Sequence, residues 1–89
     1  ILHLTLKKKW FDMIKSGVKT EEYREIKPYW NTRLNKTYTH VQFRNGYAKN
    51  APKMLVELRF IVVGFGLPSL GAPEDKQVYI LKLGEVSNE

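Results

Sequence analysis

The chain has 89 residues, 43% of them hydrophobic and 12% aromatic, which fits one compact domain over residues 1–89 and leaves no room for a second. It contains no cysteine, so disulfides and thiolate metal sites are excluded. His3 and His40 lie too far apart in the sequence to indicate a zinc site. Fifteen Lys and Arg against nine Asp and Glu give a net charge of +6, which favours polyanionic partners but also fits a simple solubility role.

Hydropathy gives no indication of a membrane partner. No apolar run approaches the roughly 18 residues of a membrane span, and the longest, Phe60–Phe65, is interrupted by Gly64. The opening segment turns basic where a signal peptide would stay apolar. We therefore expect a cytoplasmic protein, with no metal and no cofactor.

The first two elements follow from a change of period. Apolar and polar residues alternate over Leu2–Leu6, which predicts a strand with one buried face. From Lys8 the apolar residues fall three and four apart, which predicts a short amphipathic helix with a core face of Trp10, Phe11 and Ile14. Gly17 is expected to end this helix in a left-handed conformation.

Two further elements complete the first half of the chain. Residues 19–25 read as a second strand, with Thr20, Glu22 and Arg24 on one face. In the segment 27–34, Pro28 stands where a first helical turn tolerates proline, so a second short helix is possible.

The second half reads as strands joined by loops. His40–Arg44 predicts a strand closed by the turn pair Asn45 and Gly46, and Met54–Phe65 predicts one long bent strand or two short ones. Residues 66–76 predict a loop, and Gln77–Leu83 a final strand ending at Gly84. Short strands with few helices indicate a β-rich α+β domain whose sheet closes, or nearly closes, into a barrel.

The densest polar group is Lys19, Glu22 and Arg24, directly after Gly17. Arginine offers a planar fork of donors for a phosphate or a base edge, lysine a mobile charge, and glutamate an acceptor for an exocyclic amine. These side chains therefore predict a polar cleft for a nucleotide. The alternative is an ordinary exposed ion pair on a strand, which contributes well under ~1 kcal/mol.

The stretch WFDMIKSGVKTEEYR, from Trp10 to Arg24, resembles the signature of ASCH domains: an amphipathic helix, a glycine turn, a lysine, then Glu-x-Arg on a strand. The preceding HLTLKKK and the later FRNG also stand where such a domain has them. The resemblance implies a small PUA-like β-barrel with a cleft beside the first helix, and binding of RNA or a nucleotide-like ligand.

Some ASCH-like proteins are similar to amidohydrolases that deacetylate N4-acetylcytidine with a lysine, a threonine and a glutamate. By this resemblance Lys19 matches the lysine, but Glu22 stands where the threonine belongs, and Thr20 lies two residues away, a shift of about 6 to 7 Å along a strand. Glu57 is the most plausible further carboxylate. A small hydrolase is therefore an alternative function, with Lys19 and Glu22 as its catalytic residues.

Other side chains are candidates for ligand contact. Tyr29 and Trp30 are suited to stacking on a base, although Trp30 is equally suited to the core, and Arg44 belongs to a basic, aromatic loop with Tyr47 and Lys49. A third alternative function is a protein-interaction module that binds an acidic peptide.

Overall fold

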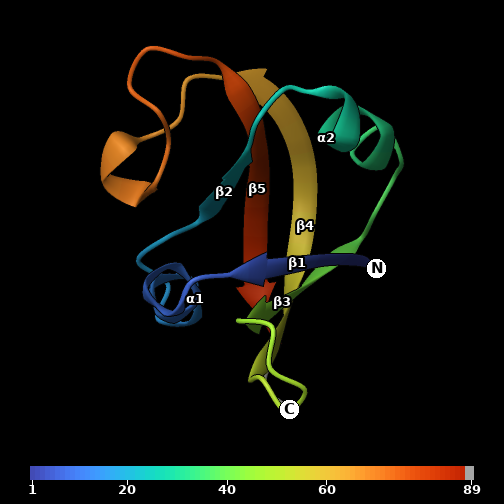
Figure 1. Cartoon of the computed structure of the whole chain (residues 1–89), viewed down its shortest axis with the longest axis vertical. Coiled ribbons are helices and arrows are strands. Elements are labelled where there is room, and N and C mark those ends of the chain that lie inside the picture. Colours follow the sequence, from blue (N-terminus) through green and yellow to red (C-terminus); the bar gives the residue numbers. More distant parts are fainter. Residues whose placement is uncertain (88–89) are drawn as a thin grey trace.

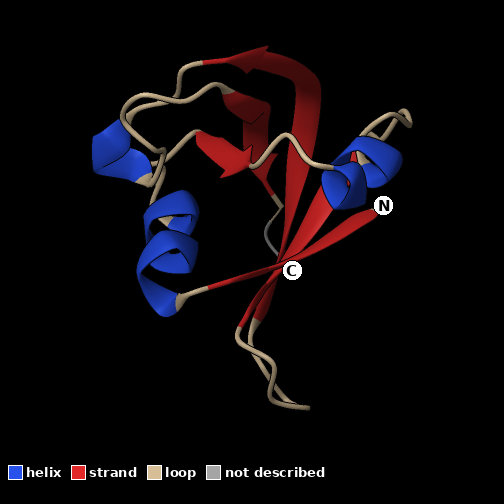
Figure 2. Ribbon diagram, turned by 45° about the horizontal axis from the view of Figure 1, so that its top comes forward, coloured by secondary structure: helices blue, strands red, loops and turns tan. Residues whose placement is uncertain are grey.

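The computed structural model describes residues 1–87 and confirms a β-rich α+β domain. Five strands form one sheet in the order β1-β3-β4-β5-β2, curled into a half-barrel (Figures 1 and 2). The pairing of β1 with β3 is parallel, and the other pairings are antiparallel. The strands are β1 (Leu2–Leu6), β2 (Glu21–Arg24), β3 (His40–Asn45), β4 (Lys53–Gly64) and β5 (Val78–Val86).

The predicted first helix is α1 (Lys8–Lys15), which buries Phe11 and Ile14 against the sheet. Trp10 is only partly buried, because it lies at the rim of the core. The helix ends as expected: Gly17 has a φ of 88°, which side chains disfavour. The second helix, α2 (Pro28–Arg33), begins with its proline, and a 3-10 turn, η1 (Pro68–Leu70), lies within the predicted loop 66–76.

The core lies inside the curl of the sheet, where alternate residues of β1, β3 and β4 point inward. Val41, Phe43 and Val56 are fully buried, as their alternation predicts. Strand β4 is one long bent strand, and its pairing with β5 shifts register on both sides of Leu58. These irregularities bend the strand near the position where the sequence pattern changes.

Two predicted boundaries were wrong. Strand β2 spans four residues, not 19–25, so Lys19 and Thr20 precede it. Thr20 therefore does not share a face with Glu22: Thr20 is exposed and Glu22 is buried. Strand β5 continues past Gly84 to Val86, because Val86 pairs with Val56 of β4.

Strands β1 and β2 are the two edges of the sheet. A side chain connects these edges: Arg24 Nη2 of β2 donates to the Thr5 carbonyl of β1 at 3.3 Å. This contact places Arg24 at the seam of the half-barrel. Neither helix of residues 1–87 has the length and hydrophobicity that a membrane-spanning helix requires.

Two glycines of this fold allow a matched test of packing. A methyl group on Gly66 would meet the Tyr23 ring and lie 2.7 Å from Ala72 Cβ, whereas one on Gly84 would meet the end of the Glu57 side chain. We expect Gly66→Ala to lower the free energy of unfolding by about 1 to 3 kcal/mol, because a ring and a loop must move. Gly84→Ala should change it by less than about 0.5 kcal/mol, since the exposed Glu57 side chain can rotate away. Urea denaturation of both variants checks this, and equal losses would contradict it.

Candidate functional site

Lys19 is buried although it is a lysine. After Gly17 the chain reverses, the Lys19 amide donates to the Met13 carbonyl at 3.0 Å, and the side chain turns into the protein. Only 2% of the residue is exposed. The Nζ atom lies 4.8 Å from the centre of the Trp10 ring and 4.7 Å from that of Tyr23, so two aromatic faces stabilise its charge.

Lys19, Glu22 and Arg24 form a continuous chain of charges. Lys19 Nζ lies 3.3 Å from Glu22 Oε1, and Arg24 Nη1 donates to Glu22 Oε2. The Glu22 side chain is 5% exposed, so its carboxylate depends on these two cations. The three side chains thus converge in the interior, and the exposed ion-pair alternative is wrong because Lys19 and Glu22 are both buried.

Lys19 also connects β2 to the loop between β4 and β5. Its Nζ donates to the Leu70 carbonyl of η1, fifty-one residues away. Burial lowers the pKa of the Lys19 ammonium, although the Glu22 carboxylate beside it acts in the opposite direction. The ammonium thus serves as an internal anchor for the loop.

Tyr23 fixes the same loop at a second point. Its hydroxyl accepts a hydrogen bond from the Leu67 amide at 3.1 Å and donates to Glu21 Oε1 at 2.8 Å. Burial, together with the hydrogen bond to Glu21, raises the pKa of Tyr23 to about 12.

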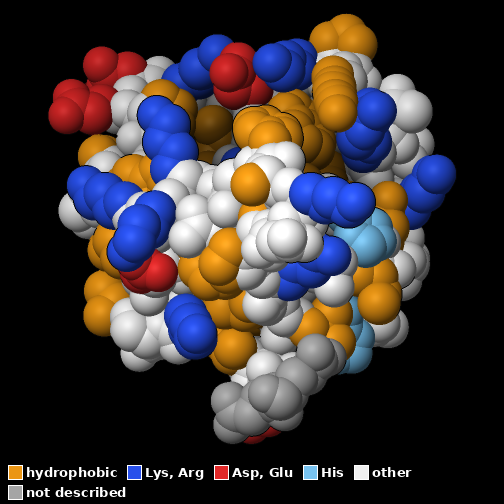
Figure 3. Space-filling model, turned by 60° about the horizontal axis from the view of Figure 1, so that its bottom comes forward, with side chains coloured by type: hydrophobic (Ala, Val, Ile, Leu, Met, Phe, Trp, Pro, Cys, Tyr) orange, Lys and Arg blue, Asp and Glu red, His pale blue; other side chains and the backbone are white. Residues whose placement is uncertain are grey.

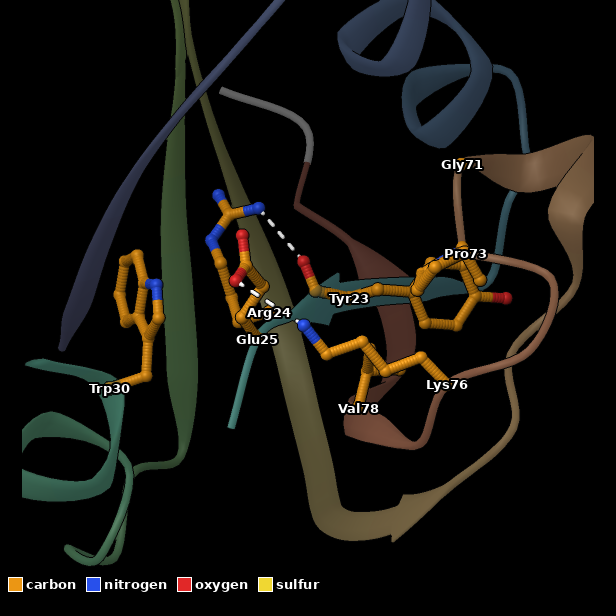
Figure 4. Close-up of a pocket in the computed structure, with 9 residues that line it drawn as sticks. Tyr23, Arg24, Glu25, Trp30, Gly71, Pro73, Lys76 and Val78 are labelled. Atoms are coloured by element: carbon orange, nitrogen blue, oxygen red, sulfur yellow. Dashed lines mark hydrogen bonds and ion pairs between the residues drawn. The ribbon is translucent and has the colours of Figure 1, made fainter. Parts of the chain in front are cut away.

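A cleft of about 530 Å³ opens where this loop faces α2, a size typical of small-ligand sites. Figure 4 shows Arg24 between Trp30 and Tyr23, with Lys76 and Glu25 nearby. Lys76 Nζ lies 3.7 Å from Glu25 Oε2, and both side chains are more than half exposed. The lining residues are Tyr23, Arg24, Glu25, Trp30, Gly71, Ala72, Pro73, Lys76 and Val78.

Not all hydrogen-bond donors of Arg24 have a partner among residues 1–87. A guanidinium has five N–H donors, and those of Arg24 make three hydrogen bonds, to Glu22, to its neighbouring Tyr23 carbonyl and to Thr5. Two donors are left, and one of them is on Nε, which is buried without a partner among residues 1–87. Its Cζ lies 5.2 Å from the centre of the Trp30 ring. The cleft therefore presents a cation and an aromatic ring side by side.

The structure divides the sequence-predicted ligand residues into three groups. Arg24 and Trp30 line the cleft, whereas Lys19 and Glu22 are buried behind it and do not line it. Tyr29 stacks on Trp30 with ring centres 4.7 Å apart and faces an adjoining hollow. Arg44 is not at the cleft, since it extends outward from β3 and donates to the Ala48 carbonyl at 2.6 Å.

The two less favoured catalytic candidates, Thr20 and Glu57, are not among the residues that line the cleft. Thr20 is exposed before β2, and Glu57 lies on the outer side of β4, 3.3 Å from Arg59 Nε. Among residues 1–87, no three or more His, Asp or Glu side chains gather where they would hold a metal ion.

Sequence reasoning missed the loop that forms one wall of the cleft, Gly71–Pro73, and the rim residue Lys76. The glycines and prolines of this loop predicted only turns. The contacts that bring the loop to β2, through Leu67 and Leu70, join residues 44 and 51 positions apart. No local pattern reports such pairings. Tyr23 was expected on the face of the strand opposite Glu22 and Arg24, and no sequence pattern indicated that it lines the cleft.

Comparison with known proteins gives no matching family model, no matching curated protein and no matching solved structure. The ASCH resemblance consequently stays a prediction from the residues between Trp10 and Arg24.

Two glutamates offer a matched test of the buried charges. Glu22 is held between Lys19 and Arg24, whereas Glu25 makes a longer, exposed pair with Lys76. We expect Glu22→Gln to lower the free energy of unfolding by about 3 kcal/mol, because Lys19 loses its anion in the interior. Glu25→Gln should cost less than about 1 kcal/mol. Urea denaturation of both variants measures the difference, and similar values would show that Glu22 is not a dependent buried charge.

Tyr23 predicts an alkaline transition. The unfolded chain releases the tyrosine proton near pH 10 and the folded chain holds it to about 12, so stability falls as pH rises between these values. Tyr23→Phe removes this contribution. The stability difference between the natural protein and Tyr23→Phe should therefore shrink between pH 10 and 12. Denaturation at several pH values checks this, and a difference that stays constant would contradict the raised pKa.

Proposed function

We propose that the domain binds single-stranded RNA or a nucleotide in the cleft beside Arg24, as an ASCH-type domain would. The observation that carries the proposal is the Arg24 guanidinium, with one Nη2 donor still unused, next to the Trp30 ring in the cleft. A nucleotide supplies a flat base that packs beside the Arg24–Trp30 pair, and phosphate or carbonyl oxygens for the guanidinium.

The surroundings of Arg24 support this role. Its Nη1 is fixed by the Glu22 carboxylate, which Lys19 holds from the other side, so the guanidinium is oriented before any ligand arrives. Lys76 at the rim is exposed and carries a mobile charge suited to a phosphate. The net charge of +6 adds an attraction that salt weakens.

The two alternatives have less support. A hydrolase would need Lys19 and Glu22 to reach a substrate, and both are buried and engaged with one another. No threonine is among the residues that line the cleft. An acidic peptide would use Arg24 and Lys76, but it would supply no base to pack beside the Arg24–Trp30 pair.

The test is the affinity for a fluorescently labelled oligouridylate. Arg24→Ala should weaken binding by about 10- to 100-fold, because hydrogen bonds to a charged donor contribute about 1.5 to 3 kcal/mol. Arg59→Ala removes the same charge from a residue that pairs with Glu57 and does not line the cleft, and it should change affinity by less than about twofold. Equal effects of the two variants would overturn the proposed site.

Because Arg24 also holds Glu22, its removal affects the fold, and Trp30→Ala provides a second test. Trp30 lies on the short helix α2 and takes no part in the buried charge chain. Loss of a stacking ring is worth about 1 to 3 kcal/mol per base. A Trp30→Ala protein with unchanged circular dichroism and unchanged RNA affinity would exclude the cleft as the binding site.

A further inference from the structure

Two further hollows follow the cleft, each sharing lining residues with the one before it. A hollow of about 400 Å³ shares Arg24 and Trp30 with the cleft, and it extends over β1 to Tyr29 and Tyr47. Another, of about 460 Å³, shares His3, Leu4 and Thr5 with the second hollow and reaches β3 and β4. Through these shared residues the three hollows lie next to one another, from β2 over β1 to β4.

The second hollow is aromatic. Tyr29 lies against Trp30 with an angle of 21° between the ring planes, and the Arg33 guanidinium covers its other face with Cζ 3.5 Å from the ring centre. Tyr47, in the turn after β3, is 89% exposed and makes no contribution to the core. Every nucleic-acid base offers a face that can stack on an exposed ring. Tyr47 thus offers a contact beyond those that one nucleotide at Arg24 needs.

The third hollow is cationic. Strand pairing places Thr5 beside Arg44, and Arg44 beside Lys53, with all three side chains on the outer face. Arg44 makes a single side-chain hydrogen bond, to Ala48, and its buried Nε has no partner among residues 1–87. Four of its five donors are therefore unused.

Carboxylates are absent from the residues that line the second and third hollows. The acid on the outer face of β4 is Glu57, which is paired with Arg59 at the other end of the β3–β4 pairing. Lys and Arg side chains also predominate over Asp and Glu on the face in Figure 3, where histidines lie among them. The charge of this surface complements a chain of phosphates.

We propose that the three hollows form one track for a single strand of RNA several nucleotides long. One base lies beside Arg24 and Trp30 in the cleft, a further base stacks on Tyr47, and Arg44 and Lys53 bind the backbone phosphates. This inference rests on the proposed function of the cleft and extends it from one nucleotide to a strand. A single strand fits because its bases are free to stack on protein rings, whereas those of a duplex are stacked inside it.

The test compares ligand lengths. Affinity is measured for uridine monophosphate and for a hexauridylate, with the natural protein and with the double variant Arg44→Ala/Lys53→Ala. We expect the hexauridylate to bind more tightly than the mononucleotide. The double variant should weaken hexauridylate binding about tenfold or more and lower its salt dependence by about 1.4 in log–log slope, because two phosphate contacts of about 0.7 each are lost. Its affinity for the mononucleotide should be unchanged.

A matched control is Lys36→Ala/Arg59→Ala, which removes the same charge from residues outside the three hollows. Equal losses in the two double variants, or equal affinities for the two ligand lengths, would overturn the track and leave the cleft in place. Failure of the natural protein to bind either ligand would instead overturn the proposed function.

Two competitors identify the strand. A hexadeoxyuridylate lacks only the 2′-hydroxyl groups, so weaker competition by it supports RNA, and equal or stronger competition overturns the choice of RNA over DNA. A hexaglutamate peptide carries charge without bases. Competition by this peptide equal to that of hexauridylate would overturn the role of the aromatic rings.

Discussion

The Glu22 carboxylate lies between the Lys19 ammonium and the Arg24 guanidinium, inside the domain. Each cation makes a further contact with a carbonyl oxygen: Lys19 with Leu70 after β4, and Arg24 with Thr5 of β1. One carboxylate on the short strand β2 thereby connects three parts of the chain. Burying a charge costs free energy unless oppositely charged or hydrogen-bonding groups surround it. Here one of those groups, Arg24, also joins β2 to β1 at the seam of the sheet.

This arrangement explains why a site forms at Arg24. The charge chain holds one side of the guanidinium and leaves the other at the cleft, beside Trp30. The loop that forms the opposite wall is held by Lys19 and by the Tyr23 hydroxyl. Fold stability and the shape of the cleft therefore depend on the same residues.

The parts of this structure that were predictable depend on local periodicity. Local sequence patterns predicted three features correctly. They are the buried strand face of Val41 and Phe43, the buried helix face of Phe11 and Ile14, and the turn at Gly17. The grouping of Lys19, Glu22 and Arg24 was also predictable, because the three lie within six positions. Its depth was not, since burial of Lys19 comes from Trp10, Tyr23 and the distant Leu70.

The remaining errors have similar physical causes. The second strand was drawn too long because Lys19 and Thr20 look like strand residues, although the edge position of β2 limits its pairing to the four residues opposite β5. Arg44 was grouped with the cleft by composition, and only the parallel pairing of β1 with β3 shows that it lies further along the surface. The length of β2 and the position of Arg44 both depend on strand pairings between distant segments, and such pairings cannot be recognised from a local sequence pattern.

The order of strands has a consequence for synthesis on the ribosome. β5, near the end of the chain, lies between β4 and β2, and Glu21 pairs with Lys82 across sixty-one positions. The strand that carries Arg24 has no neighbour in the sheet until β5 has emerged. A nascent chain therefore cannot complete the cleft before β5 has been synthesised.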